Sequence, residues 1–213
     1  EAEDLGLDPG KKTILYAGAG SDLAPHDEEI LRDLLAAIES GQVNVPAQLI
    51  VRPHPKYTYR SEIIKPSSTW ILDRPGRVVG VKASDWEFAE ADMVHLLNSL
   101  AHCDLLIHTA STLGIEAAIF DKPSISIAFD GDFKLPPALS VARYYKYIHL
   151  SRVVATGGMK IAKNFEELLS FTNQYLKNPE LDQEKRKKIV AENVSIIDGR
   201  AGERIAAFLL SKL

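Results

Sequence analysis

One stretch, residues 104–127, limits what this chain can fold into more than any other part of the sequence. It contains an apolar run of strand length, a Ser-Thr pair that can begin a helix, and a Lys-Pro break before a second apolar run. Strand, helix and strand in this order form a βαβ unit, whose two strands lie parallel. The helix between them is almost wholly apolar, so we expect it to pack deep against a sheet.

One carboxylate, Glu116, interrupts this apolar helix. Because acidic side chains are seldom fully buried without a partner, we expect Glu116 either to meet a cation or hydroxyls inside the protein or to face a cleft. Ser111 or Thr112 is the expected N-cap, which would leave the amides of the first turn able to bind an anion. Two interpretations stay open: phosphate at the helix start with ribose hydroxyls on Glu116, or a capped core helix whose glutamate reaches solvent.

Two other apolar runs also end in residues suited to phosphate. Residues 12–17 are followed by Gly18-Ala19-Gly20-Ser21, whose amides could close on a phosphate or could form a tight turn with no ligand. Residues 48–51 are followed by Arg52-Pro53-His54-Pro55-Lys56, where two prolines hold the imidazole between two cations. An unliganded surface turn is the alternative for this second segment.

The central βαβ unit adds two more candidates at strand ends. His108 ends the first of its strands and is expected to project near Ser111. Asp130 follows the second strand in an Asp-Gly-Asp loop that could receive sugar hydroxyls, although ordinary turns have the same composition. Apolar strands that alternate with helices predict an α/β fold, with a doubly wound, mostly parallel, Rossmann-like sheet. Ligands of such sheets bind beyond the carboxyl ends of the strands, so these segments predict one shared site.

The remaining pattern predicts further elements of this sheet. Residues 69–72 are expected to form a third strand and residues 148–155 the last one. Asn164 is the expected N-cap of a following helix, with Glu167 in capping-box position. The basic run 185–188 is interpreted as a solvent-exposed helix face. Three helices are expected after the last strand, over residues 164–177, 182–193 and 199–213.

Charge and cysteine content exclude several classes of protein. A net charge of -4 gives no reason to expect a nucleic-acid partner. Cys103 alone cannot build a disulfide framework or a multi-thiolate metal site, which is typical of a reducing cytosol. No apolar run approaches the roughly 20 residues of a membrane-spanning helix, and the first residues do not resemble a signal peptide. We therefore expect a cytoplasmic location, or the inner face of the membrane for a longer protein, and no metal.

The first residues also suggest how the chain is divided. Residues 1–12 are charged, begin without Met and end in Asp-Pro-Gly-Lys-Lys, so they are interpreted as a linker. Residues 13–213 are enough to bury a full core in one domain. We expect this domain to be a piece of a longer, two-domain protein.

Two segments resemble a known family. They are RPHP at residues 52–55 and DMVHLLNSLAHCDLLIHTASTLGIEAAIFDKPSISIAFD at residues 92–130. Together they resemble the C-terminal, donor-binding half of a GT-B glycosyltransferase of the bacterial surface-polysaccharide type. Related enzymes are CDP-glycerol glycerophosphotransferases, sialyltransferases with His-Pro and Ser-Ser/Thr motifs, and UDP-GlcNAc 2-epimerases. The ending that starts at Asp198 is also similar to the CDP-glycerol group.

The resemblance implies sugar transfer from a nucleotide-activated donor in polysaccharide biosynthesis, with no metal or other cofactor. An acceptor-binding N-terminal domain would lie outside this chain, the catalytic base stays unassigned, and the isolated domain would bind nucleotide weakly and turn over nothing. Glu116 would take the ribose hydroxyls, and Asp130 would face the transferred group. The residues implied at the donor phosphates are Gly20, Ser21, Arg52, His54, His108, Ser111 and Thr112.

Two other functions stay open. An epimerase would be expected to carry His-Arg soon after the first strand, where this chain reads AGAGSDL, so transfer is favoured. Glycerophosphate transferases have Asp-Tyr-Ser-Ser where this chain reads HTASTL, which weighs against that reaction. The third function is a non-catalytic module of the same fold that binds a nucleotide or a protein.

Overall fold

The computed structural model describes residues 6–55, 57, 64, 67–74, 76–80, 85–194 and 196–212, apart from the side chain of Val78. Within these residues a six-stranded sheet has the order β3-β2-β1-β6-β7-β8, and β4 and β5 form a separate two-stranded sheet. Neighbouring strands of the large sheet pair in parallel. The strands are β1 (Lys12–Ala17), β2 (Ala47–Arg52), β3 (Trp70–Leu72), β4 (Arg77–Val78), β5 (Trp86–Glu87), β6 (Leu105–His108), β7 (Ser124–Ile127) and β8 (Lys160–Ala162).

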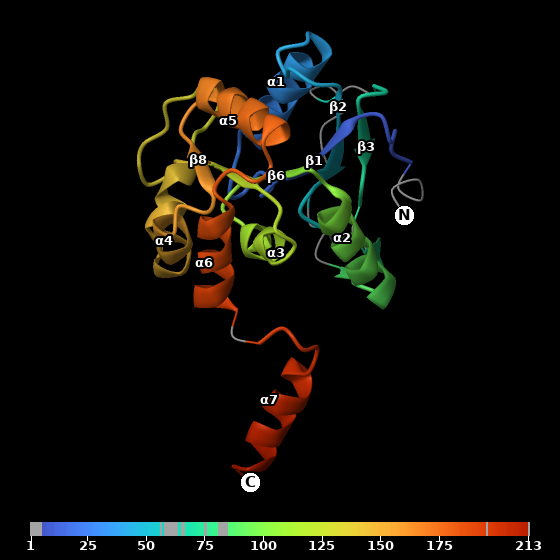
Figure 1. Ribbon diagram of the computed structural model, residues 1–213, viewed down its shortest axis with the longest axis vertical. Coiled ribbons are helices and arrows are strands. Elements are labelled where there is room, and N and C mark those ends of the chain that lie inside the picture. Colours follow the sequence, from blue (N-terminus) through green and yellow to red (C-terminus); the bar gives the residue numbers. More distant parts are fainter. Residues whose placement is uncertain are drawn as a thin grey trace.

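Helices cover both faces of the large sheet, which confirms the predicted α/β, doubly wound architecture (Figure 1). Alternate strand residues point to opposite faces, so Ile14 and Tyr16 pack toward α1 and α5 while Leu15 packs toward α2 and α3. The helices are α1 (Asp27–Glu39), α2 (Glu90–His102), α3 (Leu113–Ile119), α4 (Ile148–Ala155), α5 (Phe165–Lys177), α6 (Gln183–Asn193) and α7 (Ala201–Leu210), with a 3-10 helix η2 at Val141–Lys146.

The order in which the chain adds strands to the sheet reverses between β1 and β6. The first part of the chain adds β2 and β3 on one side of β1, and the later part adds β7 and β8 on the far side of β6. Loops that leave the carboxyl ends of β1 and β6 therefore diverge, which leaves room for a ligand at this point of the edge.

The strand predicted over residues 148–155 is wrong, because this segment is helix α4. Leu150 and Val153 are its buried residues, and their spacing of three is a helical period. Val153 and Val154 are β-branched residues, which favour strands when only the local sequence is considered. The last strand is instead β8, whose three residues pair with β7 and are too few to show a pattern.

The three C-terminal helices are present. Asn164 accepts a hydrogen bond from the Glu167 amide at 2.8 Å, so the predicted cap is confirmed. Helix α7 extends away from the body of the molecule and buries none of its residues (Figure 1). No helix among the described residues combines the length and apolar character needed to cross a membrane.

Two predicted surface segments make more contact than expected. Arg186, in the basic run 185–188, is 1% exposed and binds Asp121 as well as the Leu181 and Pro179 carbonyls. Its guanidinium anchors α6 against the end of α3, so the run is not wholly a solvated face. In the predicted linker, Leu7 is buried against the sheet.

Candidate functional site

The carboxyl ends of β1, β2 and β6 surround a pocket of about 130 Å³. Arg52 and His54 reach it from the end of β2, Gly18 from the end of β1, and Ser111 from the loop after β6. Apolar walls come from neighbouring residues, among them Leu113 of α3. The parallel register explains the convergence, since Ala17 pairs with both Arg52 and His108 at the same level of the sheet.

Arg52 is the buried cation of this pocket. It is the last residue of β2 and is 5% exposed, on the face of the sheet that α2 and α3 cover. Its Nη1 donates to Asp73, which is 8% exposed just after β3. Its Nη2 is also buried, and no described residue accepts a hydrogen bond from it. The guanidinium therefore keeps one amino group for a further acceptor.

Glu116 lies on α3, half-buried and within electrostatic reach of Arg52. Burial raises the pKa of its carboxyl, and the positive charge of Arg52 opposes part of that increase. No hydrogen bond or ion pair among the described residues joins Glu116 to Arg52, and Glu116 lies beside the pocket without lining it. Hydroxyl groups of a ligand would find an acceptor here.

His108 lies beneath the pocket loop and does not line the pocket. Its ring is fully buried, its Nδ1 accepts a hydrogen bond from the Ser111 amide at 3.2 Å, and its Nε2 lies 3.2 Å from the Met159 sulfur. Burial lowers the pKa of His108 to about 3, so the imidazole is neutral. Direct phosphate binding by His108 does not fit this geometry; the ring positions Ser111.

The loop between His108 and Ser111 is held in a strained shape. Ala110 has φ of 47°, in the left-handed region that side chains rarely adopt. Its amide donates to the Tyr145 hydroxyl at 3.0 Å, and that hydroxyl donates to the Ile127 carbonyl at 2.5 Å. Such strain persists where surrounding contacts enforce it, and it is concentrated at functional sites.

The amides at the start of α3 are less available than the sequence suggested. The Ser111 amide is bound to His108, and the Leu113 amide donates to Ser111 Oγ at 3.2 Å. In the described part of the chain the Thr112 amide has no acceptor, but Thr112 is exposed and does not line the pocket. Because Ser111 Oγ accepts from Leu113, its own proton is free to point at a ligand.

Gly20 and Ser21 are not among the pocket residues; Gly18 lines the pocket instead. Gly20 has φ of 84°, and a Cβ there would lie 2.1 Å from the Tyr57 ring. Tyr57 also donates a hydrogen bond to Asp22 at 2.6 Å. Gly20 therefore permits a close contact between the two loops that follow β1 and β2.

We expect Gly20→Ala to lower the free energy of unfolding by about 2 kcal/mol, because the new methyl group meets the Tyr57 ring and the positive φ is strained. Urea unfolding measures this change. Gly41→Ala is the matched control, since Gly41 has φ of 77° with nothing within 4 Å of its Cβ position. An equal loss in both variants would show that backbone strain alone is responsible.

Asp130 lies on the other face of the sheet from Arg52, at the end of β7. Its carboxylate accepts a hydrogen bond from the Val141 amide at 3.0 Å, and it is 6% exposed. It shares a small cavity with Asp27 and Thr109. The structure therefore does not bring Asp130 to the pocket of Arg52.

The sequence analysis missed Asp27, which begins α1. Its Oδ1 accepts hydrogen bonds from Thr109 at 3.0 Å and Tyr16 at 3.1 Å, while its Oδ2 is buried with no partner among the described residues. Burial raises the pKa of Asp27 to about 6. An acidic residue in the first turn of a helix has an ordinary role there, so no sequence signal marked this one.

A larger hollow of about 520 Å³ lies at the opposite edge of the sheet, beside the start of β2 and the end of α1. It is open to solvent and faces the amino ends of the strands, where parallel sheets do not bind ligands. We therefore assign the site to the smaller pocket. No group of three or more His, Cys, Asp or Glu side chains in the described ranges could hold a metal ion.

No protein-family model and no curated protein sequence matches this chain. Solved structures do. A single-residue variant of the wall teichoic acid polymerase TagF is 16% identical with a TM-score of 0.60, over 99% of this chain and 46% of that one. A UDP-GlcNAc 2-epimerase from Neisseria meningitidis, solved bound to UDP-GlcNAc, is 14% identical with a TM-score of 0.54, over 97% of this chain and 47% of that one.

These likenesses establish the fold. The chain spans less than half the length of either structure. The polymerase and the epimerase belong to the groups that the RPHP and HTASTLGIEAA segments resemble. The chain thus has the Rossmann-like architecture of one half of a GT-B protein, with a pocket at the carboxyl edge of its sheet.

Proposed function

We propose that this chain is the nucleotide-sugar donor domain of a GT-B glycosyltransferase of surface-polysaccharide biosynthesis. The observation that supports it most is the convergence of Arg52, His54 and Ser111 from two separate strand ends on one pocket. A guanidinium, an imidazole and a hydroxyl group can all donate hydrogen bonds to a phosphate. Glu116 on the adjacent helix would accept the ribose hydroxyls.

The volume of the pocket supports a phosphate subsite and no more. Pockets for whole small molecules are typically ~300 Å³ or larger, whereas this one is about 130 Å³. The diphosphate would occupy it, and the base and the sugar would extend along the open edge of the sheet. Arg52 and Ser111 would stabilise the negative charge that develops on the leaving diphosphate, at a few kcal/mol for each well-placed donor.

The acceptor site and the catalytic base would be on another domain, and we assign no catalytic residue. A donor domain needs its partner domain for turnover, so we expect this chain alone to bind nucleotide weakly and to catalyse nothing. A sugar-nucleotide 2-epimerase is the second candidate, supported by the fold likeness to the meningococcal enzyme. Product analysis of a longer protein separates the two, because transfer needs an acceptor and epimerisation does not.

A thermal-shift panel of UDP, CDP, CMP and GDP tests binding by this chain. A ligand at a hundred times its Kd stabilises the folded state by about 2.7 kcal/mol. We expect one of the four to raise Tm, and Ser111→Ala and Glu116→Ala each to weaken it several-fold.

Matched controls are Ser170→Ala and Glu166→Ala, two exposed positions on α5. They should leave the affinity unchanged. A folded sample that responds to none of the four nucleotides would contradict the proposal and favour a non-catalytic module. Unchanged affinity in both pocket variants would place the nucleotide elsewhere.

A further inference from the structure

The guanidinium of Arg52 is held from one side only. Nη1 donates to Asp73, while Nη2 is buried and reaches no acceptor on any described residue. A buried polar group without a partner costs free energy, so an unused donor at a pocket wall marks the place of a missing acceptor. Arg52 is one of the residues that line the pocket. An oxyanion would complete its hydrogen bonds.

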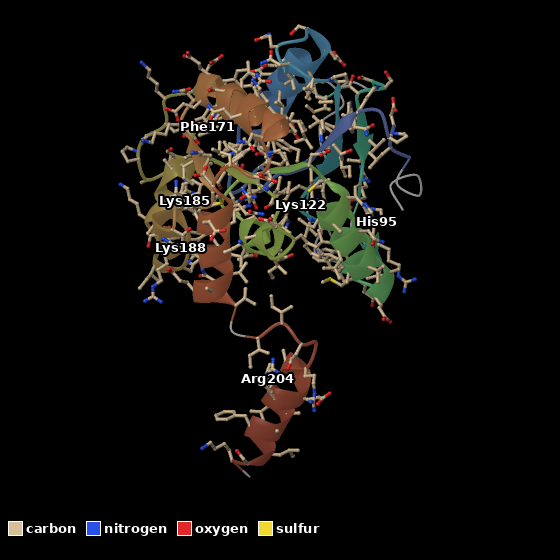
Figure 2. The ribbon with its side chains drawn as sticks, in the orientation of Figure 1. His95, Lys122, Phe171, Lys185, Lys188 and Arg204 are labelled. Atoms are coloured by element: carbon tan, nitrogen blue, oxygen red, sulfur yellow. The ribbon has the colours of Figure 1, made fainter. Side chains whose placement is uncertain are left out.

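Asp73 is itself held on both oxygens. Oδ2 faces Arg52, and Oδ1 lies 2.9 Å from Nε2 of His95, which is labelled on α2 in Figure 2. The carboxylate thus connects the end of β2 with a helix on the same face of the sheet. Both members of the Arg52–Asp73 pair are 6% exposed at their side chains, whereas His95 is 41% exposed.

Two further carboxylates among the described residues interact electrostatically with Arg52. They are Glu116 of α3 and Asp92 of α2, and Asp92 also interacts with His95. The Asp92 carboxylate accepts hydrogen bonds from the Gly76 amide at 2.9 Å and the Ala89 amide at 2.7 Å. Asp73 is the carboxylate that neutralises Arg52 directly, and so it sets how much positive charge an anion in the pocket meets.

We propose that Asp73 is a positioning residue: it orients the Arg52 guanidinium so that Nη2 stays available to an oxyanion, and its charge limits how tightly the pocket binds a bare anion. A ligand that brings hydroxyl groups for Glu116 as well as an anion would then be preferred over a simple anion. This inference rests on the proposed function only in taking the pocket as a phosphate subsite.

Sulfate is the probe, because its charge is constant across neutral pH. We measure its Kd by thermal shift at constant ionic strength, with chloride replaced stepwise by sulfate. Asp73→Asn keeps an amide oxygen that can accept from Arg52 and so retains the positioning contact, but it removes one negative charge next to the cation. It should therefore bind sulfate about tenfold more tightly than the unchanged protein. The same variant should be less stable without sulfate, since a buried cation loses its partner.

His95→Ala should act in the opposite direction. In the unchanged protein the Asp73 carboxylate contacts both Arg52 and His95. Without the imidazole it interacts with Arg52 alone and neutralises more of its charge, so sulfate should bind about threefold more weakly than to the unchanged protein. His95 is half-exposed, and this variant decides the question if Asp73→Asn fails to fold with or without sulfate. Arg52→Met with Asp73→Asn should abolish the sulfate response.

Asp121→Asn is the matched control, because it also removes the carboxylate partner of a buried arginine, Arg186, outside the pocket. It should lose stability without any gain in sulfate affinity. Equal sulfate affinity in folded Asp73→Asn and unchanged protein, or a shift of the same sign in His95→Ala, would overturn the inference. A sulfate response without any nucleotide binding would contradict the proposed function and leave this inference standing.

Discussion

Lowering the pH from about 6.5 to 3 is expected to remove up to about 5 kcal/mol of stability through one side chain, His108. Its folded pKa is about 3 because the ring is buried, whereas an unfolded histidine has its ordinary pKa near 6.5. A base with a lowered folded pKa contributes stability above 6.5 that is lost as the pH falls toward 3. Between these values the unfolded chain binds the extra proton and the folded one does not.

The difference in pH slope between the unchanged protein and His108→Asn, both followed by urea unfolding, measures this loss. Asparagine retains an acceptor for the Ser111 amide but does not titrate, so the variant should lack the contribution of His108 to the slope. The smaller side chain lowers stability at every pH, and therefore the slope is compared, not the absolute value. His149→Gln, at an exposed histidine, should keep the original slope. A slope unchanged by His108→Asn would contradict the assignment.

The free energy of unfolding is expected to depend on pH through Asp27 in the opposite sense to His108, with a total effect of about 3 kcal/mol. Its folded pKa is raised to about 6 from an ordinary 3.8 because the carboxyl is buried. An acid with a raised folded pKa contributes stability that is fully present below 3.8 and is lost as the pH rises through 6. Between 3.8 and 6 the two residues therefore oppose each other, and each one hides the other in the unchanged protein.

Single variants should separate the two slopes. In Asp27→Asn the free energy of unfolding should fall more steeply than in the unchanged protein as the pH decreases from 6 to 4, because the opposing contribution of Asp27 is gone. In His108→Asn the slope should change in the opposite sense over the same range, because the contribution of His108 is gone. Asp33→Asn, on the outer side of the same helix, should leave the profile of the unchanged protein. Parallel profiles in the two buried-site variants would refute the prediction.

The sequence predicted the strands and helices that are long enough to show a clear hydrophobic pattern. The apolar runs at β1, β2, β6 and β7 and the long helices α1, α2 and α5 carry enough pattern for this. Strand β8 has three residues, and α4 has adjacent valines that favour a strand. In such short segments packing against neighbours decides the structure, and local preference does not.

The candidate site was predictable in its location but not in its contacts. Their positions at strand ends place Arg52, His54 and Ser111 at one edge of a parallel sheet, and the strand order β2-β1-β6 brings them close together. The partner of Arg52, however, lies 21 residues away after a three-residue strand. Likewise, nothing in the local sequence says that His108 takes the Ser111 amide, because that depends on how deeply the ring is buried.

The position of the pocket between β1 and β6 has a mechanical consequence. Strands β1, β2 and β3 come from the first 72 residues, and β6, β7 and β8 come from residue 105 onward, so the sheet is two consecutive halves joined along one seam. Gly18 and Arg52 belong to the first half, and Ser111 belongs to the second. A molecule that contacts all three would bind both halves at once, so its binding would stabilise the pairing of β1 with β6.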